Sequence, residues 1–61
     1  MTVLIRRRVR NDEYAEEEVV WPKGWPLPAE GSILLGNSVS GRVEHLEFDL
    51  PNARVLIIVR P

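Results

Sequence analysis

Apolar and polar residues alternate along residues 2–21 in a pattern that predicts two antiparallel strands joined by a tight turn. With residues 11–13 as the loop, each apolar residue of the first strand faces an apolar residue of the second. The same register sets arginine opposite glutamate in three pairs, Arg6/Glu18, Arg7/Glu17 and Arg8/Glu16. Such opposed charges stabilise a strand pair by roughly 0.2–1 kcal/mol each. A two-residue loop would set Ile5 against Glu18, so the pattern favours a long hairpin with a three-residue loop.

The segment 21–31 interrupts this pattern with three prolines, two glycines and two tryptophans. Proline lacks a backbone N–H and restricts the residue before it to extended conformations, so the segment predicts a structured loop. Trp21, Trp25 and Leu27 each precede a proline and are expected to project from a stiff backbone. Trp21 shares a face with Val3 in the predicted hairpin, so we expect it to plug one end of a small barrel. Trp25 fits either a plug or an interface.

Three further strands are predicted at 32–35, 39–48 and 53–60, with turns at 36–38 and 49–52. The first is apolar throughout and is expected to be buried on both sides. Gly41 predicts a bulge or bend, and the mixed pattern around His45 indicates a change of phase. In the last hairpin we expect Phe48 opposite Ala53. The final strand is apolar on both faces and therefore predicts a central or doubly covered position.

These elements make one domain, residues 1–61, of the all-β class. We expect a five-stranded antiparallel meander curled into a small barrel, with a long N-terminal hairpin. The stretch Gly41–Phe48 followed by Arg54–Arg60 resembles the SH3-like small barrels of many bacterial and phage proteins. The Ala-Leu-Tyr-Asp-Tyr signature of signalling SH3 domains is absent, so the resemblance implies a fold and supplies no binding residues.

Composition narrows the classes of function. Eight basic and nine acidic residues give a formal charge of −1, and there is one histidine and no cysteine. A disulfide is excluded and a structural zinc site is not expected. The longest apolar run, Val55–Val59, is far shorter than the roughly 18 residues of a membrane span. We expect a soluble, cytoplasmic protein without metal or cofactor, stabilised by efficient packing or self-association because small domains are marginally stable.

No catalytic motif is complete. The stretch Gly36–Ser40 lacks the second glycine of a nucleophile elbow, and His45 has no predicted partner for proton transfer. Glu16, Glu17 and Glu18 alternate between the two faces of a strand and cannot converge on one cation. The sequence therefore predicts a non-enzymatic protein.

Two binding functions remain open. The first is a protein-binding or assembly module, docking on a larger protein or on a second copy through the edge of the hairpin. Its candidate interface residues are Tyr14, Trp21, Trp25 and Leu27. The alternative is nucleic-acid binding through Arg6, Arg8 and Arg10, which lie on one face at about 6.6 Å spacing. Glu16 and Glu18 on the same face would repel the phosphates of such a ligand.

Overall fold

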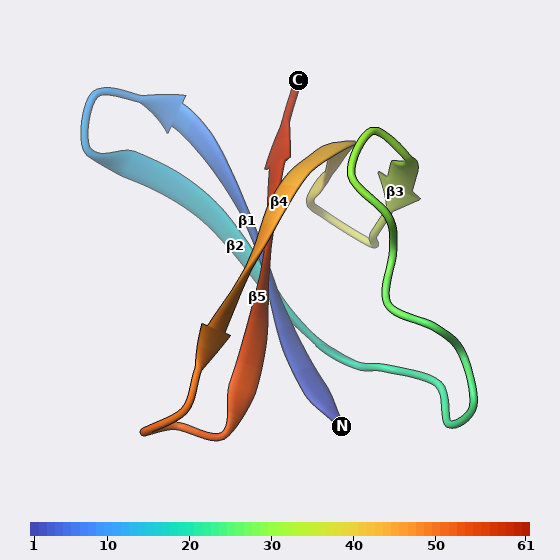
Figure 1. Cartoon of the computed structure of the whole chain (residues 1–61). Helices are drawn as coiled ribbons and strands as arrows, with labels where there is room; N and C mark the ends of the chain where they lie inside the picture. Colours follow the sequence, from blue (N-terminus) through green and yellow to red (C-terminus); the bar gives the residue numbers. More distant parts are fainter.

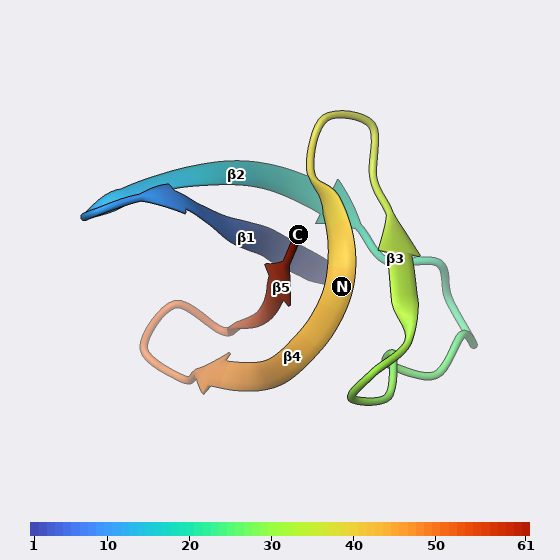
Figure 2. The ribbon, with the colours of Figure 1, turned by 90° about the horizontal axis from the view of Figure 1, so that it is seen from above.

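The computed structural model describes all 61 residues and contains five β-strands and no helix. The strands are β1 (Thr2–Arg10), β2 (Glu13–Val20), β3 (Ile33–Leu35), β4 (Ser40–Asp49) and β5 (Arg54–Arg60). They form one sheet in the order β2-β1-β5-β4-β3. The sheet curls into a half-barrel, with the tip of the first hairpin on one side and β3 on the other (Figures 1 and 2). The predicted all-β class is confirmed.

The central strand is β5, which pairs with β1 on one side and with β4 on the other. The β1–β5 pair is parallel, whereas the other three pairs are antiparallel. The expected antiparallel meander is therefore confirmed only in part, because the sheet is mixed. The strand order confirms the predicted central position of β5. A strand that is apolar on both faces gains most from neighbours on both sides.

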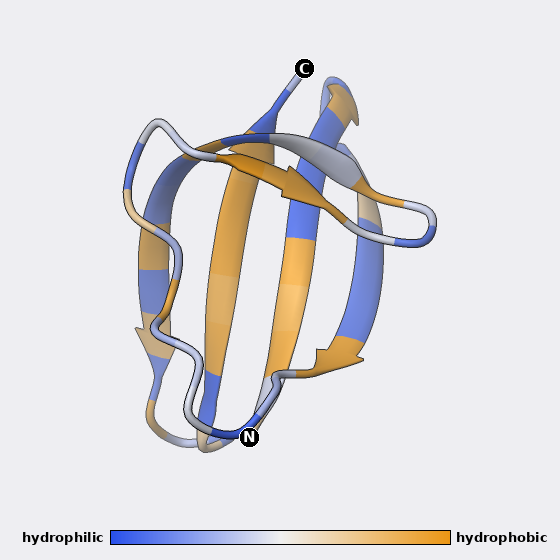
Figure 3. Ribbon diagram, turned by 90° about the vertical axis from the view of Figure 1, so that its right-hand side faces the viewer, coloured by the Kyte–Doolittle hydropathy of each residue, from blue (hydrophilic) through white to orange (hydrophobic).

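The hydrophobic core lies on the concave face of the sheet, which Figure 3 shows lined by the apolar middle strands. Seven residues form it: Val3, Ile5, Val39, Val43, Val55, Ile57 and Val59. Trp21 and Leu27 of the loop after β2, together with Leu34 and Leu46, are half-buried against this cluster. On the opposite, convex face, Leu4 pairs with Leu56 and both are buried. Trp21 packs on the same side of the sheet as Val3, as the predicted hairpin implied.

The first hairpin has a different register from the predicted one. Arg6 lies opposite Glu16, Arg7 opposite Ala15 and Arg8 opposite Tyr14, so all three predicted arginine–glutamate pairs are wrong. The turn is the two residues Asn11 and Asp12, and the register shifts between Arg8 and Arg10. This bulge inserts one extra residue, which lets the short turn keep Arg6, Arg7 and Arg8 on their expected faces, whereas Val9 at the bulge is exposed and lines the same surface as Arg8 and Arg10. The arginines of β1 consequently retain their predicted faces although their partners change.

The second hairpin also differs from the prediction. Phe48 pairs with Val55 and Asp49 with Arg54, so Phe48 does not face Ala53. Asp49 accepts hydrogen bonds from Asn52 at 2.9 Å and from Arg54 at 3.1 Å. The Asn52 amide and the Arg54 guanidinium hold the pKa of Asp49 below its usual value. These side-chain contacts across the turn were not visible in the apolar pattern that set the predicted register.

The change of phase near His45 is confirmed, because the register of the β4–β5 pair shifts between Val43 and His45. Gly41 does not form this irregularity. It lies where the backbone of Arg60 approaches so closely that a Cβ atom would collide with the Arg60 carbonyl. The glycine is therefore required by strand packing, and the register shift of β4 lies farther along, between Val43 and His45.

A set of contacts that we call the Glu17 clasp connects the two sides of the half-barrel. In the clasp, the carboxylate of Glu17 accepts hydrogen bonds from the backbone N–H groups of residues 37–39. The three N···O distances are 3.0 Å to Asn37, 2.8 Å to Ser38 and 3.0 Å to Val39. The backbone amides, that of Ser38 first, lower the pKa of Glu17 from 4.5 to about 2. Arg7 reaches the same loop, where Nη1 donates to the carbonyl of Ser40 at 3.1 Å. The clasp joins β2 to the β3–β4 loop.

Candidate functional site

The sheet has two free edges, β2 and β3, and they differ in charge. The β2 sequence carries four glutamates, whereas residues 32–37, which contain β3 and its flanks, carry no charge. Charged residues on an edge strand discourage pairing with another chain, and an uncharged apolar edge lacks this protection. The β3 edge is therefore the unguarded edge of this sheet.

The outward side chains of β3 are large, aliphatic and exposed. Ile33 is 59% exposed and Leu35 is 81% exposed, while Leu34 between them packs against the core. The prediction that this strand is buried on both sides is wrong. It is the last strand of the sheet, and no element of the chain covers its outer face.

The predicted protein-interface residues do not form one surface. Trp21 and Trp25 meet edge to face with ring centroids 6.4 Å apart, and Trp21 Nε1 donates to the Trp25 carbonyl at 3.3 Å. Trp21 and Leu27 pack against the core, whereas Trp25 is 66% exposed. The loop that carries Trp25 lies on the same side of the half-barrel as β3 (Figure 3). Tyr14 lies on the first hairpin, which projects from the opposite side (Figures 1 and 2).

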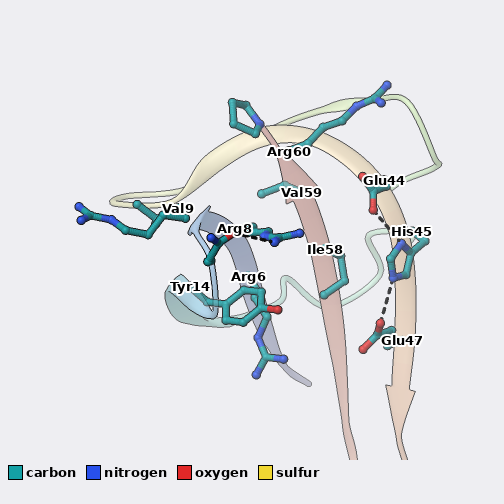
Figure 4. Close-up of a pocket in the computed structure, with 13 residues that line it drawn as sticks. Arg6, Arg8, Val9, Tyr14, Glu44, His45, Glu47, Ile58, Val59 and Arg60 are labelled. Carbon is teal, nitrogen blue, oxygen red and sulfur yellow. Dashed lines mark hydrogen bonds and ion pairs between the residues drawn. The ribbon is translucent and has the colours of Figure 1, made fainter.

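A second surface is an open groove of about 620 Å³ on the convex face. One row of residues crosses its floor, because Ile58 of β5 pairs with Arg6 of β1 and with His45 of β4. The β1–β5 pairing ends at Arg7 and Val59, beyond which the first hairpin diverges from β5. Figure 4 shows the residues around the resulting space. The groove therefore arises where two parallel strands separate at their carboxyl ends.

All three arginines predicted to contact nucleic acid, Arg6, Arg8 and Arg10, line this groove, and Arg60 joins them. They differ in their partners. The Arg6 Nε atom lies 2.6 Å from the Glu16 carboxylate, and the Arg10 Nε atom lies 3.7 Å from that of Glu13. Arg8 has only a long hydrogen bond of 3.4 Å to the Asn11 side chain, and Arg60 has no side-chain hydrogen bond or ion pair.

Other groups give the groove two chemically different walls. On the hairpin wall, Tyr14 is 52% exposed, and the Arg6 guanidinium lies 5.2 Å from the centre of its ring. On the β4 wall, His45 lies between Glu44 at 3.5 Å and Glu47 at 2.9 Å (Figure 4). The first wall presents cations and an aromatic ring, and the second presents hydrogen-bond acceptors.

Arg60 was missed by the sequence analysis. Its position beside the Arg-rich strand depends on the parallel β1–β5 pair, which was not predicted. A signal was nevertheless present, since Arg60 continues the alternation of Leu56 and Ile58 on one face of the last strand.

The structure contains no group of three or more histidine, aspartate or glutamate side chains that could hold a metal ion. It also contains no helix long and apolar enough to cross a membrane. Comparison of the chain with protein-family models, with curated proteins and with solved structures found no match, so the β3 edge and the convex-face groove are the basis for its functional assignment.

Proposed function

We propose that this domain is a non-enzymatic assembly module that associates with a second copy of itself through the β3 edge. The observation that carries this proposal is the unguarded edge, where Ile33 and Leu35 face solvent on a strand without a neighbour. Exposed apolar edge strands pair readily with other strands. Strand addition at a free edge is a recurring mode of protein recognition.

The chemistry of the edge favours a second copy as the occupant. In a two-fold symmetric pair the same surface meets itself, so the edge must be complementary to itself, and an edge without charge brings no like charges together. Residues 32–37 are uncharged and meet this condition. Antiparallel pairing centred on Leu34 would set Ile33 of one copy opposite Leu35 of the other. The two exposed aliphatic side chains would then cover each other across the dimer axis.

The size of the exposed surface supports the same conclusion. A compact monomer of 7.0 kDa is expected to expose about 4,000 Å². This chain exposes 4483 Å² and measures 33 × 25 × 19 Å. Nine large hydrophobic residues are exposed, and only nine residues of any kind are buried. The number of large apolar side chains in contact with water therefore equals the total number of buried residues. Association through an apolar edge would reduce this imbalance.

If the same edge instead docks on a strand of a different protein, the isolated chain would be monomeric. The sedimentation experiment distinguishes these two cases. The resemblance to SH3-like barrels of bacterial and phage proteins, and the cytoplasmic location, remain predictions from the sequence.

The test is sedimentation equilibrium over a concentration series up to the millimolar range. Wild type is expected to dimerise, and Leu35→Lys is expected to be monomeric because each lysine would face the apolar Ile33 of the other copy and lose water at the interface. Leu50→Lys is the matched control, since Leu50 is 82% exposed in the β4–β5 turn. It should dimerise like wild type. A monomeric wild type, or a Leu35→Lys variant that still dimerises, would contradict self-association through β3.

A further inference from the structure

The convex-face groove has the dimensions of a small-ligand site. Its volume of about 620 Å³ lies within the roughly 300–1,000 Å³ typical of such sites. Its wall on the first hairpin is far from β3, which lies on the other side of the molecule (Figures 1 and 2). An occupant of the groove therefore leaves the β3 edge free.

The groove is basic although the protein as a whole is slightly acidic. Four arginines and two glutamates line it, while the whole chain carries a formal charge of −1. Arg6 and Arg10 are neutralised by Glu16 and Glu13, which lie outside the lining. The uncompensated cations are the other two, Arg8 and Arg60.

The sheet register brings Arg8 and Arg60 to the same end of the groove. Arg6 pairs with Ile58 and Arg7 with Val59, so Arg8 and Arg60 are the next positions along the two parallel strands. Both continue the convex face, and pairing stops before them. Arg8 and Arg60 have no carboxylate partners and stand on adjacent strands, so they can form a seat for an anion with several oxygen atoms once the Arg60 side chain, which extends toward β4 in Figure 4, turns toward Arg8. Phosphate fits this seat because guanidinium donors match its oxygens in pairs.

Tyr14 adds a flat apolar surface beside this anion seat. The Arg6 guanidinium lies over the ring, and half of the side chain stays accessible to solvent. Aromatic rings beside arginines are the usual platform on which bases stack in single-stranded nucleic acids. Ile58 supplies an apolar floor on β5, with Arg6 of β1 between it and the hairpin strand that carries Tyr14 (Figure 4). The combination of a ring, an apolar floor and a phosphate seat suits a nucleotide better than a simple anion.

The glutamates of the opposite wall fix the orientation of such a ligand. Glu44 and Glu47 both repel phosphate, and Glu44 lines a smaller hollow together with Arg60, so the phosphate must lie on the Arg8 side of Arg60. Their carboxylates, and the His45 ring between them, can accept hydrogen bonds from ribose hydroxyl or base amino groups. The acidic residues thus disfavour an unbroken run of phosphates along the groove and suit one or two nucleotides.

We propose that the convex-face groove binds a nucleotide unit, with the base on Tyr14 and the phosphate on Arg8 and Arg60. This assignment changes the predicted nucleic-acid site, in which Arg6 and Arg10 had the same role as Arg8. The unit has two sources, a free mononucleotide or a short single-stranded stretch of nucleic acid. The chemistry in the groove is the same for both.

The test is titration of the ¹⁵N-labelled chain, at low salt, with adenosine monophosphate, with a short oligo-adenylate and with inorganic phosphate. Shifts in the amide signals of Arg8, Tyr14 and Arg60 are expected with either nucleotide ligand. If only the oligomer binds, the source is nucleic acid; if the monophosphate also binds, it is a free nucleotide. Absence of binding by both would overturn the proposal, as would equally tight binding of inorganic phosphate, because the base would then contribute nothing.

Substitutions test the role proposed for each side chain of the groove. Tyr14→Leu should weaken binding by roughly fivefold or more through lost stacking. Arg8→Gln/Arg60→Gln should reduce the slope of log affinity against log salt by about 0.7 for the oligomer, because the two arginines hold one phosphate. Lys23→Gln/Arg54→Gln is the matched control, because it removes the same charge from residues outside the groove, and Arg54 lies at the opposite end of β5 from Arg60. If that control loses as much affinity as the groove variant, binding is a general charge effect and the groove is not the site.

Discussion

The carboxylate of Glu17 on β2 accepts the backbone N–H of Ser38 at 2.8 Å, across 21 residues of sequence. The same carboxylate binds the neighbouring amides of Asn37 and Val39. An ionised carboxylate that accepts several backbone amides forms strong, charge-assisted hydrogen bonds. Because β2 and β3 are the two edges of the sheet, this contact fixes the curvature of the half-barrel without any strand pairing between them.

Replacing Glu17 with glutamine should lower the melting temperature more than replacing Glu18 with glutamine. The amide keeps one acceptor oxygen but presents an NH₂ group toward amides that are themselves donors. Glu18 is the control because it is exposed, lies on the same strand and makes no side-chain hydrogen bond or ion pair, so the charge change is identical. Thermal unfolding followed by circular dichroism measures both. Equal melting temperatures for the two variants would mean that the clasp adds nothing to stability.

Stability should fall with acidification between about pH 4.5 and pH 2. The pKa of Glu17 is about 2 in the folded chain and 4.5 without these contacts. A carboxylate with a lowered folded-state pKa stabilises the fold fully above its unfolded value, and the gain disappears as pH falls through the folded value. The pKa of Asp49 is lowered as well and acts in the same direction.

The measurement is the urea midpoint as a function of pH, for wild type and for Glu17→Gln. The variant should show the weaker dependence on pH across that window. Asp49→Asn provides the comparison that separates the contribution of the β4–β5 turn. A Glu17→Gln profile parallel to that of wild type would show that other carboxylates cause the acid loss.

The proposed dimer predicts a specific cross-link. Antiparallel pairing centred on Leu34 sets position 33 of one copy opposite position 35 of the other, at a separation that a disulfide can span. The chain has no cysteine of its own, so introduced thiols have no competing partners. An oxidised mixture of Ile33→Cys and Leu35→Cys should give a linked heterodimer, seen by mass spectrometry. Each variant alone should cross-link much less, and comparable homodimers would indicate a different pairing.

Residue alternation was enough to predict the number of strands, the faces of β1 and β2 and the central place of β5. It could not supply absolute register. A two-residue shift in pairing leaves every side chain on the same face, so the alternation of Arg6 with its neighbours fits either register. The bulge between Arg8 and Arg10 has no signature of its own in the pattern.

The candidate sites were harder to predict because each depends on contacts between distant segments. The apolar run at Ile33 indicates a strand, but only the strand order shows that it ends the sheet and leaves its outer face open. Likewise, the role of Glu17 depends on backbone amides of a loop, and such donors are present in every sequence. The turn-forming residues Gly36 and Asn37 marked the loop without indicating its acceptor.

The parallel pairing of β1 with β5 has a consequence for how the protein is made. Val3 pairs with Val55, so the two strands at the centre of the sheet come from opposite ends of the chain. During synthesis, the apolar residues of β1 remain exposed to water or bound by a chaperone until β5 has been synthesised. Contacts between such distant segments also slow folding, because the long intervening chain must be closed first. The centre of the core therefore forms only after residues 54–60 have been synthesised.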